Sequence, residues 1–342
     1  MFAFIVRRLL FLPVVIFVLT VIIVGLLQLL SPERRAAAYV TNEQQARNLE
    51  AIIKDHGLDQ PFHIQYWMWL KSALRGDLGF SKASNKPVVA TIKERFPSTV
   101  ELAVYSLIPL LGFGIWFGTI AGLNRNKFVD QFARIYATIT NNIPTFVLGV
   151  ILLVIFYGFF NLAPGPGQLS PENQVNLIIK PVPRITGMLS FDALLAGNWV
   201  IFWDVLRHLI LPVITLTTVS TSTLIMVTRG SLIDTLSQDY VRTARAKGLP
   251  ERVVNLKHAR RNALLPVATL GGFQVIGLLG GAIITETIFA WPGVGSWGSD
   301  AAARFDVAGI LGFALLAAVV TVLMNLAVDL LYAVIDPRIR FD

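Results

Sequence analysis

The sequence predicts an all-α polytopic membrane protein with six transmembrane helices. Hydrophobic residues make up 54% of the 342 residues and charged residues only 15%, against about 25% charged residues in ordinary soluble chains. Six long apolar blocks follow one another along the chain, and none of the 29 Lys and Arg residues lies inside a block. The net charge of +8 therefore follows the pattern of membrane topology, and no nucleic-acid partner is expected.

The first transmembrane helix is expected within residues 1–30. Residues 9–30 carry no charge, and at about 1.5 Å per residue they span roughly 33 Å, enough for a hydrocarbon core of about 30 Å. A cleaved signal peptide is the alternative, because three alanines follow at 36–38. The apolar run exceeds the usual length for a signal peptide, and Arg34 and Arg35 precede the alanines, so an uncleaved helix is favoured.

Residues 31–97 are predicted to form an extracytoplasmic amphipathic segment with two short helices. Thr41 and Gln44 have the spacing of a capping box for the first helix, which Gly57 ends. The second helix begins near Pro61, carries a cluster of aromatic residues, and stops before Gly76. Aromatic clusters of this kind are typical of the membrane–water interface.

Five further apolar blocks, at about 99–122, 135–160, 209–228, 264–289 and 307–335, predict the transmembrane domain 98–335. Ser98 and Glu101, just after Pro97, have capping-box spacing. We therefore expect a helix to start at Ser98 and assign Glu101 a capping role. Pro144 should kink the third span because proline removes a backbone donor. The connection 161–206, rich in Pro and Gly, predicts a structured loop outside the membrane.

Two glycine-containing stretches suggest close packing. Gly277 and Gly281 have the GxxxG spacing of helix–helix contacts. Pro292, Gly293 and Gly295 predict a re-entrant turn on the outer side. All of these glycines are therefore assigned structural roles.

The distribution of charge predicts the orientation. With the N-terminus inside, the inner segments hold 15 Lys and Arg and six Asp and Glu, a net +9, whereas the outer segments hold 14 and twelve, a net +2. The positive-inside rule then places both termini, including the tail 336–342, in the cytoplasm.

The chain lacks the usual signs of catalysis. It has no G-x-x-x-x-G-K-[ST] sequence for ATP phosphates, no cysteine, and four histidines without metal-ligand spacing. No metal site, bound cofactor or enzymatic activity is expected. Glu286 and Asp329 are the acidic residues within spans that could serve a proton relay. A stand-alone ion-coupled secondary carrier is therefore the weaker alternative, and a non-transporting scaffold is a third.

The inner loop 229–263 is the most informative stretch. A short helix over 240–247, with Ala244 facing outward, should end at Gly248, and a basic helix should follow from about Pro250 to Asn262. The loop either only fixes topology or presents a surface helix that docks into a groove of a cytoplasmic partner. The small residues at 244, 246 and 248 favour docking because they permit close approach.

Residues 239–249 (DYVRTARAKGL) with 262–266 (NALLP) resemble the EAA loop of bacterial ABC importer permeases, specifically the dipeptide/oligopeptide family. In the general EAA pattern the first Glu and Ala would fall on Arg242 and Thr243, so a salt link from that Glu is not implied. Further stretches resemble the same family: 57–61, 76–81, 95–99, 143–146, 194–199, 285–295 and 336–339.

The resemblance implies the ABC type-1 importer permease fold in a bacterial inner membrane. The chain would be a non-catalytic subunit that works with a second homologous permease, two ATPases that bind ATP and Mg²⁺, and an extracytoplasmic substrate-binding protein. The implied ATPase-coupling residues are Asp239, Tyr240, Arg242, Thr243, Ala244, Arg245, Lys247 and Gly248.

A polar translocation path is predicted in the third and fourth spans. Seven hydroxyl side chains lie within residues 215–223, and two amides lie beside Pro144. The alternative is that the hydroxyls bond to their own helix and pack helices together. The sequence does not distinguish peptides, glutathione, nickel chelates and oligosaccharides as substrates. The candidate path residues are Asn141, Asn142, Thr217, Thr218, Thr221 and Ser222.

Overall fold

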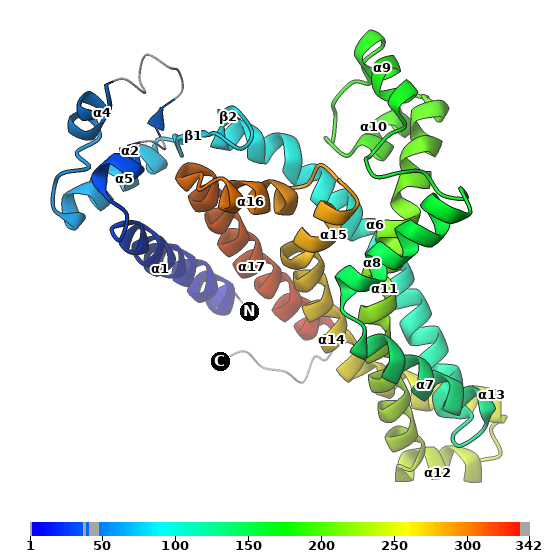
Figure 1. The fold of residues 1–342 in the computed structure, drawn as a ribbon. Coiled ribbons are helices and arrows are strands. Elements are labelled where there is room, and N and C mark those ends of the chain that lie inside the picture. Colours follow the sequence, from blue (N-terminus) through cyan, green and yellow to red (C-terminus); the bar gives the residue numbers. More distant parts are fainter. Residues whose placement is uncertain (1, 37–38, 41–47, 336–342) are drawn as a thin grey trace.

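The computed structural model describes residues 2–36, 39–40 and 48–335, and the side chains among them outside 2–9, 12, 276, 279–281 and 329–335. This part of the chain is almost entirely helical, which confirms the all-α prediction (Figure 1). One short antiparallel hairpin pairs β1 (Phe80–Ser81) with β2 (Lys86–Pro87). The helices are α1 (Phe2–Leu27), α2 (Pro32–Ala36), α4 (Leu49–Asp55), α5 (Phe62–Leu74), α6 (Val88–Leu123), α7 (Phe128–Asn142), α8 (Thr145–Leu152) with a π-helical continuation (Leu153–Phe159), α9 (Pro171–Ile179), α10 (Leu189–Leu195), α11 (Trp199–Leu236), α12 (Asp239–Ala246), α13 (Glu251–Val253) with a π-helical turn (Val254–Ala259), α14 (Arg260–Gly281), α15 (Ile283–Ile288), α16 (Val294–Ala303) and α17 (Val307–Ile335).

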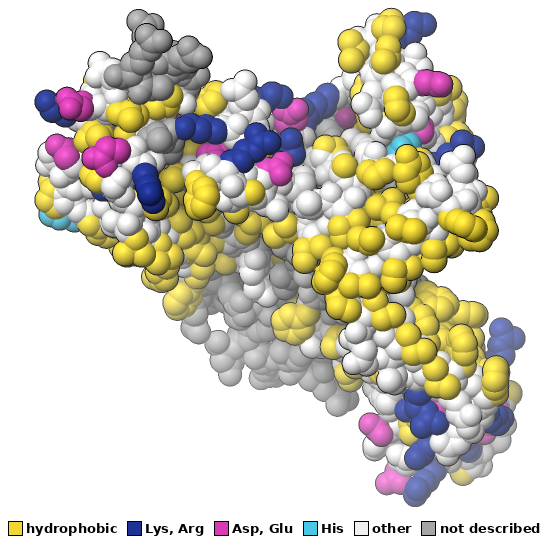
Figure 2. Space-filling model, viewed as in Figure 1, with side chains coloured by type: hydrophobic (Ala, Val, Ile, Leu, Met, Phe, Trp, Pro, Cys, Tyr) yellow, Lys and Arg dark blue, Asp and Glu magenta, His cyan; other side chains and the backbone are white. Residues whose placement is uncertain are grey.

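Three helices in the described part of the chain are long and apolar enough to cross a membrane: α6, α11 and α17. The pair α7 and α8 makes a fourth candidate, although its halves are bent by 98°. In α1, residues Pro13–Leu27 form a shorter apolar helix. The described residues thus support three or four spans by length and composition, fewer than the six predicted. Figure 2 shows a hydrophobic belt between charged side chains at the upper end and at the lower tip.

The long helices α6 and α11 pack side by side, and glycines allow the contact (Figure 1). A Cβ atom added at Gly114 or Gly118 would come within 2.6 Å of side chains on α11, and one at Gly122 within 3.1 Å. Small residues at this spacing let helix backbones approach closely. The predicted pair of glycines, Gly277 and Gly281, gives no such evidence. A Cβ atom added at Gly277 would meet no described atom within 4 Å, and the surroundings of Gly281 lie outside the described residues.

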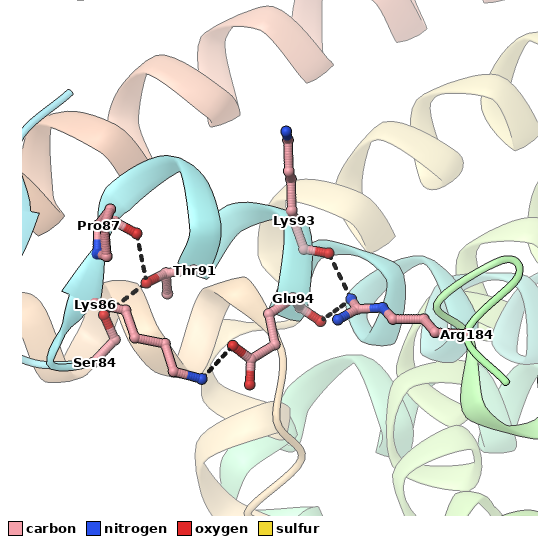
Figure 3. Close-up of polar contacts among 7 residues, drawn as sticks. All are labelled: Ser84, Lys86, Pro87, Thr91, Lys93, Glu94 and Arg184. Carbon is pink, nitrogen blue, oxygen red and sulfur yellow. Dashed lines mark hydrogen bonds and ion pairs between the residues drawn. The ribbon is translucent and has the colours of Figure 1, made fainter. Parts of the chain in front are cut away.

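The prediction that a helix starts at Ser98 is wrong, because α6 begins ten residues earlier at Val88 and runs through Pro97. A proline inside a helix leaves the carbonyl four residues before it without its usual donor. Here that carbonyl belongs to Lys93, and the Arg184 guanidinium donates to it at 2.7 Å (Figure 3). The loop arginine therefore replaces the missing backbone donor, and the helix continues.

The third predicted span is broken rather than kinked. α7 ends at Asn142, and α8 begins at Thr145 after Pro144, with a bend of 98° between the two halves. The block predicted over 264–289 is also divided, because α14 ends at Gly281 and α15 starts at Ile283.

The segments outside the long helices contain the predicted short helices. α4 is followed by Gly57, whose φ of +58° suits a glycine, and α5 begins directly after Pro61. The predicted cap residues Thr41 and Gln44 lie outside the described residues. α9 and α10 lie within the 161–206 connection, as expected for a structured loop.

Candidate functional site

The first candidate site is the module built around α12, which projects at the tip of the molecule (Figure 1). Val241 and Ala244 form its buried face. They belong to one core cluster with Leu232 of α11 and with Val254 and Ala259 of the following segment. The prediction that Ala244 faces outward is wrong, because this side chain is only 6% exposed and packs against its own chain.

The opposite face of α12 is polar and solvent-exposed. Two exposed ion pairs involve this face: Arg242 pairs with Asp239 within α12 at 3.4 Å, and Arg245 pairs with Glu251 of α13 at 2.9 Å. Exposed pairs of this kind add little stability, so the cations stay available to a partner. The turn after α12 uses the left-handed region. Of the predicted coupling residues, those exposed are Asp239, Tyr240, Arg242, Thr243, Arg245, Lys247 and Gly248, the last with φ of +72°.

A buried ion pair joins α7 to α11, close in sequence to the part of α11 on which this module packs. Asp130, in the first turn of α7, is fully buried and accepts from the Arg229 guanidinium, with Nη2 to Oδ2 at 2.9 Å. The backbone N–H of Asn126 donates to the same carboxylate at 2.8 Å. Close by, the Ser231 hydroxyl donates to the Ala263 carbonyl at 2.9 Å. Sequence reasoning missed this pair, since nothing local connects positions 99 residues apart.

The predicted path residues are brought together on α7 and α11. Thr217 and Thr218 donate to carbonyls of their own helix at 2.7 Å, which is the back-bonding alternative. Ser222 also donates to Asn141 Oδ1 at 2.6 Å and so joins the two helices. Asn142 donates to its own helix at 2.6 Å. The side chains buried in this arrangement are Thr217, Thr221 and Ser222.

A carboxylate clamp holds the predicted turn between α15 and α16. Glu286 is fully buried and accepts from Thr99 of α6 at 2.7 Å and from the Ser296 N–H at 2.9 Å. A Cβ atom at Gly293 would lie 2.2 Å from this carboxyl group, and one at Gly295 would lie 2.9 Å from it. Glycines are therefore required here by close approach, and Glu286 acts as a positioning residue. The turn also contains Pro292, as predicted.

Glu101 does not cap a helix, which corrects the role predicted for it. It is fully buried in the interior of α6 and accepts from the Ser190 N–H at 2.6 Å and from Gln168 Nε2 at 2.8 Å. The carboxylate thus fastens the 161–198 connection to α6. Glu101 and Glu286 hold the same end of the molecule together from two sides.

The residues described by the structure contain no group of three or more His, Asp or Glu side chains that could hold a metal ion. The sites described above present hydrogen-bond donors, buried carboxylates and exposed cations. These groups suit binding and mechanical coupling between helices.

Comparison with known proteins decides the family. Residues 114–341 match the family described as "Binding-protein-dependent transport system inner membrane component", and residues 1–103 match the N-terminal family of the same systems. The chain belongs to this family. The permease thus has the ABC type-1 fold and is a multi-pass membrane protein that works with a substrate-binding protein and an ATPase.

Individual relatives are also permeases. The chain is 40% identical over 291 residues to the "Probable D,D-dipeptide transport system permease protein DdpB" of Escherichia coli (strain K12), covering 85% of this chain and 84% of the relative. It is 34% identical over 341 residues, all of both chains, to the "Dipeptide transport system permease protein DppB" of Alkalihalophilus pseudofirmus. The "Glutathione transport system permease protein GsiC" of Escherichia coli O6:H1 matches equally far at 34%. These relatives support the importer permease over a stand-alone carrier.

Proposed function

We propose that this permease passes dipeptides or oligopeptides from an extracytoplasmic binding protein across the bacterial inner membrane by alternating access. The observation that carries the proposal is the end-to-end identity of 34% with a dipeptide permease. A relative named for glutathione matches over the same length, and glutathione is itself a small peptide. Short peptides are therefore the substrate class that the relatives share.

The loop 229–263 would couple transport to ATP. In this proposal the polar face of α12, including Tyr240, Thr243 and Lys247, docks into a groove of an ATPase subunit. Two such ATPases bind ATP and Mg²⁺, and a second homologous permease completes the channel. This chain itself holds no cofactor. Its part is to convert closure of the ATPases into movement of α11, on which the buried face of α12 rests.

The proposed orientation places α12 and both termini in the cytoplasm. The hairpin, α4, α5, α9 and α10 lie at the opposite end of the molecule, which would face the binding protein (Figure 1). This end carries exposed polar side chains fixed by local contacts. Lys86 pairs with Glu94 at 2.6 Å, while the Lys93 side chain points away from both (Figure 3).

Of the path residues, Thr217, Thr221 and Ser222 are buried in this state, and alternating access would expose them in another. Asn141 and Ser222 lie directly beside the break at Pro144, where α7 and α8 change direction. Reopening of that contact would place an amide and a hydroxyl beside a passing peptide backbone, to which both can hydrogen-bond.

The coupling proposal is tested with Gly248→Asp in the permease reconstituted with its partner subunits. Gly248 is exposed, and a Cβ atom added there would meet no described atom within 4 Å, so the new side chain fits and places a negative charge on the docking face. Its φ of +72° adds backbone strain, which the control variant must share. We expect loss of ATPase subunits on co-purification and loss of peptide-stimulated ATP hydrolysis, with normal membrane insertion.

The matched control is Gly197→Asp. Gly197 has a similar φ of +68° and lies just before α11, at the other end of that helix. A Cβ atom added at Gly197 would also meet no described atom within 4 Å. This variant should retain its ATPase subunits. Wild-type retention and ATP hydrolysis in Gly248→Asp would refute the docking role of this face.

A further inference from the structure

A cavity of about 500 Å³ lies between α1, α5 and the start of α17, far from the α12 module. Its lining includes the apolar residues Val24, Leu27 and Leu311, called here the floor, and the cations Arg35, Lys71 and Arg75, called here the mouth.

The cavity lies at the boundary between membrane and water. The uncharged run of α1 ends at Leu30, and α17 becomes apolar from Val307. The apolar residues of the floor belong to one cluster shared by α1, α5 and α17, and Thr20 of α1 hydrogen-bonds Tyr66 of α5 at 2.9 Å. Trp69 of α5 also lines the cavity, and tryptophan favours this depth.

Arg35 carries a buried charge at the mouth of the cavity. It is only 8% exposed. Among the described residues its guanidinium donates to neutral acceptors: Gln28 Oε1 at 2.7 Å, Gln65 Oε1 at 2.6 Å and the Leu58 carbonyl at 3.1 Å. Its Nε has no hydrogen-bond partner in the described part of the chain. Among the described residues no carboxylate lies within ion-pair distance of it, although the exposed carboxylate of Glu33 interacts with it electrostatically. A buried charge with so little compensation is costly.

The other charged groups at the mouth increase the attraction for an anion. Lys71 and Arg75 are exposed. The lining also holds one acid, Asp77, which accepts from the Gly79 N–H at 2.9 Å; three cations and one acid leave a net charge of +2 in the lining. A small anion would satisfy Arg35 but would leave the apolar floor uncovered, whereas an amphiphile would use both sides.

We infer that this cavity binds an anionic phospholipid. The phosphodiester meets Arg35, Lys71 and Arg75, and an acyl chain covers the floor and continues down α1. The lipid would fasten the N-terminal segment to α17 at the membrane surface.

Native mass spectrometry of the full-length permease in detergent tests the site. The probes are phosphatidylglycerol, phosphatidylcholine, inorganic phosphate and glycerol 3-phosphate. One phosphatidylglycerol should bind more tightly than phosphatidylcholine. Lys71→Gln and Arg75→Gln should each weaken it about fivefold, since each cation near a membrane surface contributes about 1 kcal/mol. Lys54→Gln, an exposed cation of α4 outside the lining, should leave binding unchanged.

Two further variants separate the lipid from a free anion. Arg35→Gln should reduce phosphatidylglycerol binding at least tenfold, and the exposed-residue variants keep the test valid if this one does not fold. Val307→Trp, which narrows the apolar side, should weaken the lipid but leave inorganic phosphate unaffected. Equal affinity for the two lipids, no effect of Lys71→Gln, or displacement of the lipid by millimolar phosphate would overturn the proposal.

Discussion

The Asp130–Arg229 pair gives the sharpest test of how α7 is held to α11, the helix on which the coupling module packs. Asp130→Asn keeps the size of the side chain, and the amide oxygen can still accept from the Asn126 N–H. The substitution removes the negative charge that two guanidinium nitrogens of Arg229 now face. Arg229 is then left as a mostly buried cation without a counter-ion.

The expected loss follows from burial. Breaking a buried ion pair costs about 3–5 kcal/mol. The Arg229 side chain is 18% exposed and Asp130 is not exposed, so some solvation of the freed cation is available and the lower end applies. A loss of about 3 kcal/mol corresponds to roughly a hundredfold change in the unfolding equilibrium.

A double-mutant cycle measures the pair directly. Asp130→Asn, Arg229→Gln and the double variant are unfolded by SDS titration from mixed micelles, and the coupling energy should be about 2 kcal/mol. In the reconstituted complex, Asp130→Asn should hydrolyse ATP with weaker dependence on substrate. Additive effects within about 0.5 kcal/mol would refute the reasoning, because the two side chains would then act independently.

Two other buried carboxylates give local predictions. Gly293→Ala places a Cβ atom 2.2 Å from the Glu286 carboxyl group and should lower thermal stability by about 2–3 kcal/mol. Gly112→Ala is the control: its added Cβ atom would meet no described atom within 4 Å, so thermal stability should not fall. Equal melting temperatures for the two variants would contradict the role of Glu286 as a clamp. Asp306→Ala removes the acceptor for the Ser81 hydroxyl at 2.5 Å and for the N–H of the first turn of α17 at 3.0 Å. Hydrogen exchange should rise in the hairpin by about tenfold or more, and unchanged protection would argue against this anchor.

The prolines show how far local rules predict this fold. Pro97 and Pro144 both interrupt apolar helical stretches and give the same signal in the sequence. At Pro97 the helix continues because Arg184, 87 residues further along the chain, donates to the freed carbonyl. At Pro144 the helix breaks and turns by 98°. The long apolar helices α11 and α17 could be predicted from composition, whereas the continuation of α6 through Pro97 depended on a distant side chain.

The candidate site divides in the same way. The short helix ending at Gly248 was predictable from its local pattern, and α12 confirms it. The outward orientation of Ala244 was not, because the segment containing Val254 and Ala259 folds back over that side chain. The Glu286 clamp joins residues 187 positions apart, and no periodicity encodes such a partner.

The helix α11 is one continuous element of 38 residues, from Trp199 to Leu236. At about 1.5 Å per residue it measures roughly 57 Å, which exceeds the thickness of the bilayer. In the proposed orientation its two ends would lie in different aqueous compartments, and it would act as a lever arm. A tilt of about 10° applied where α12 rests on Leu232 would swing the far end by roughly 10 Å, unless the arm flexes at Pro212.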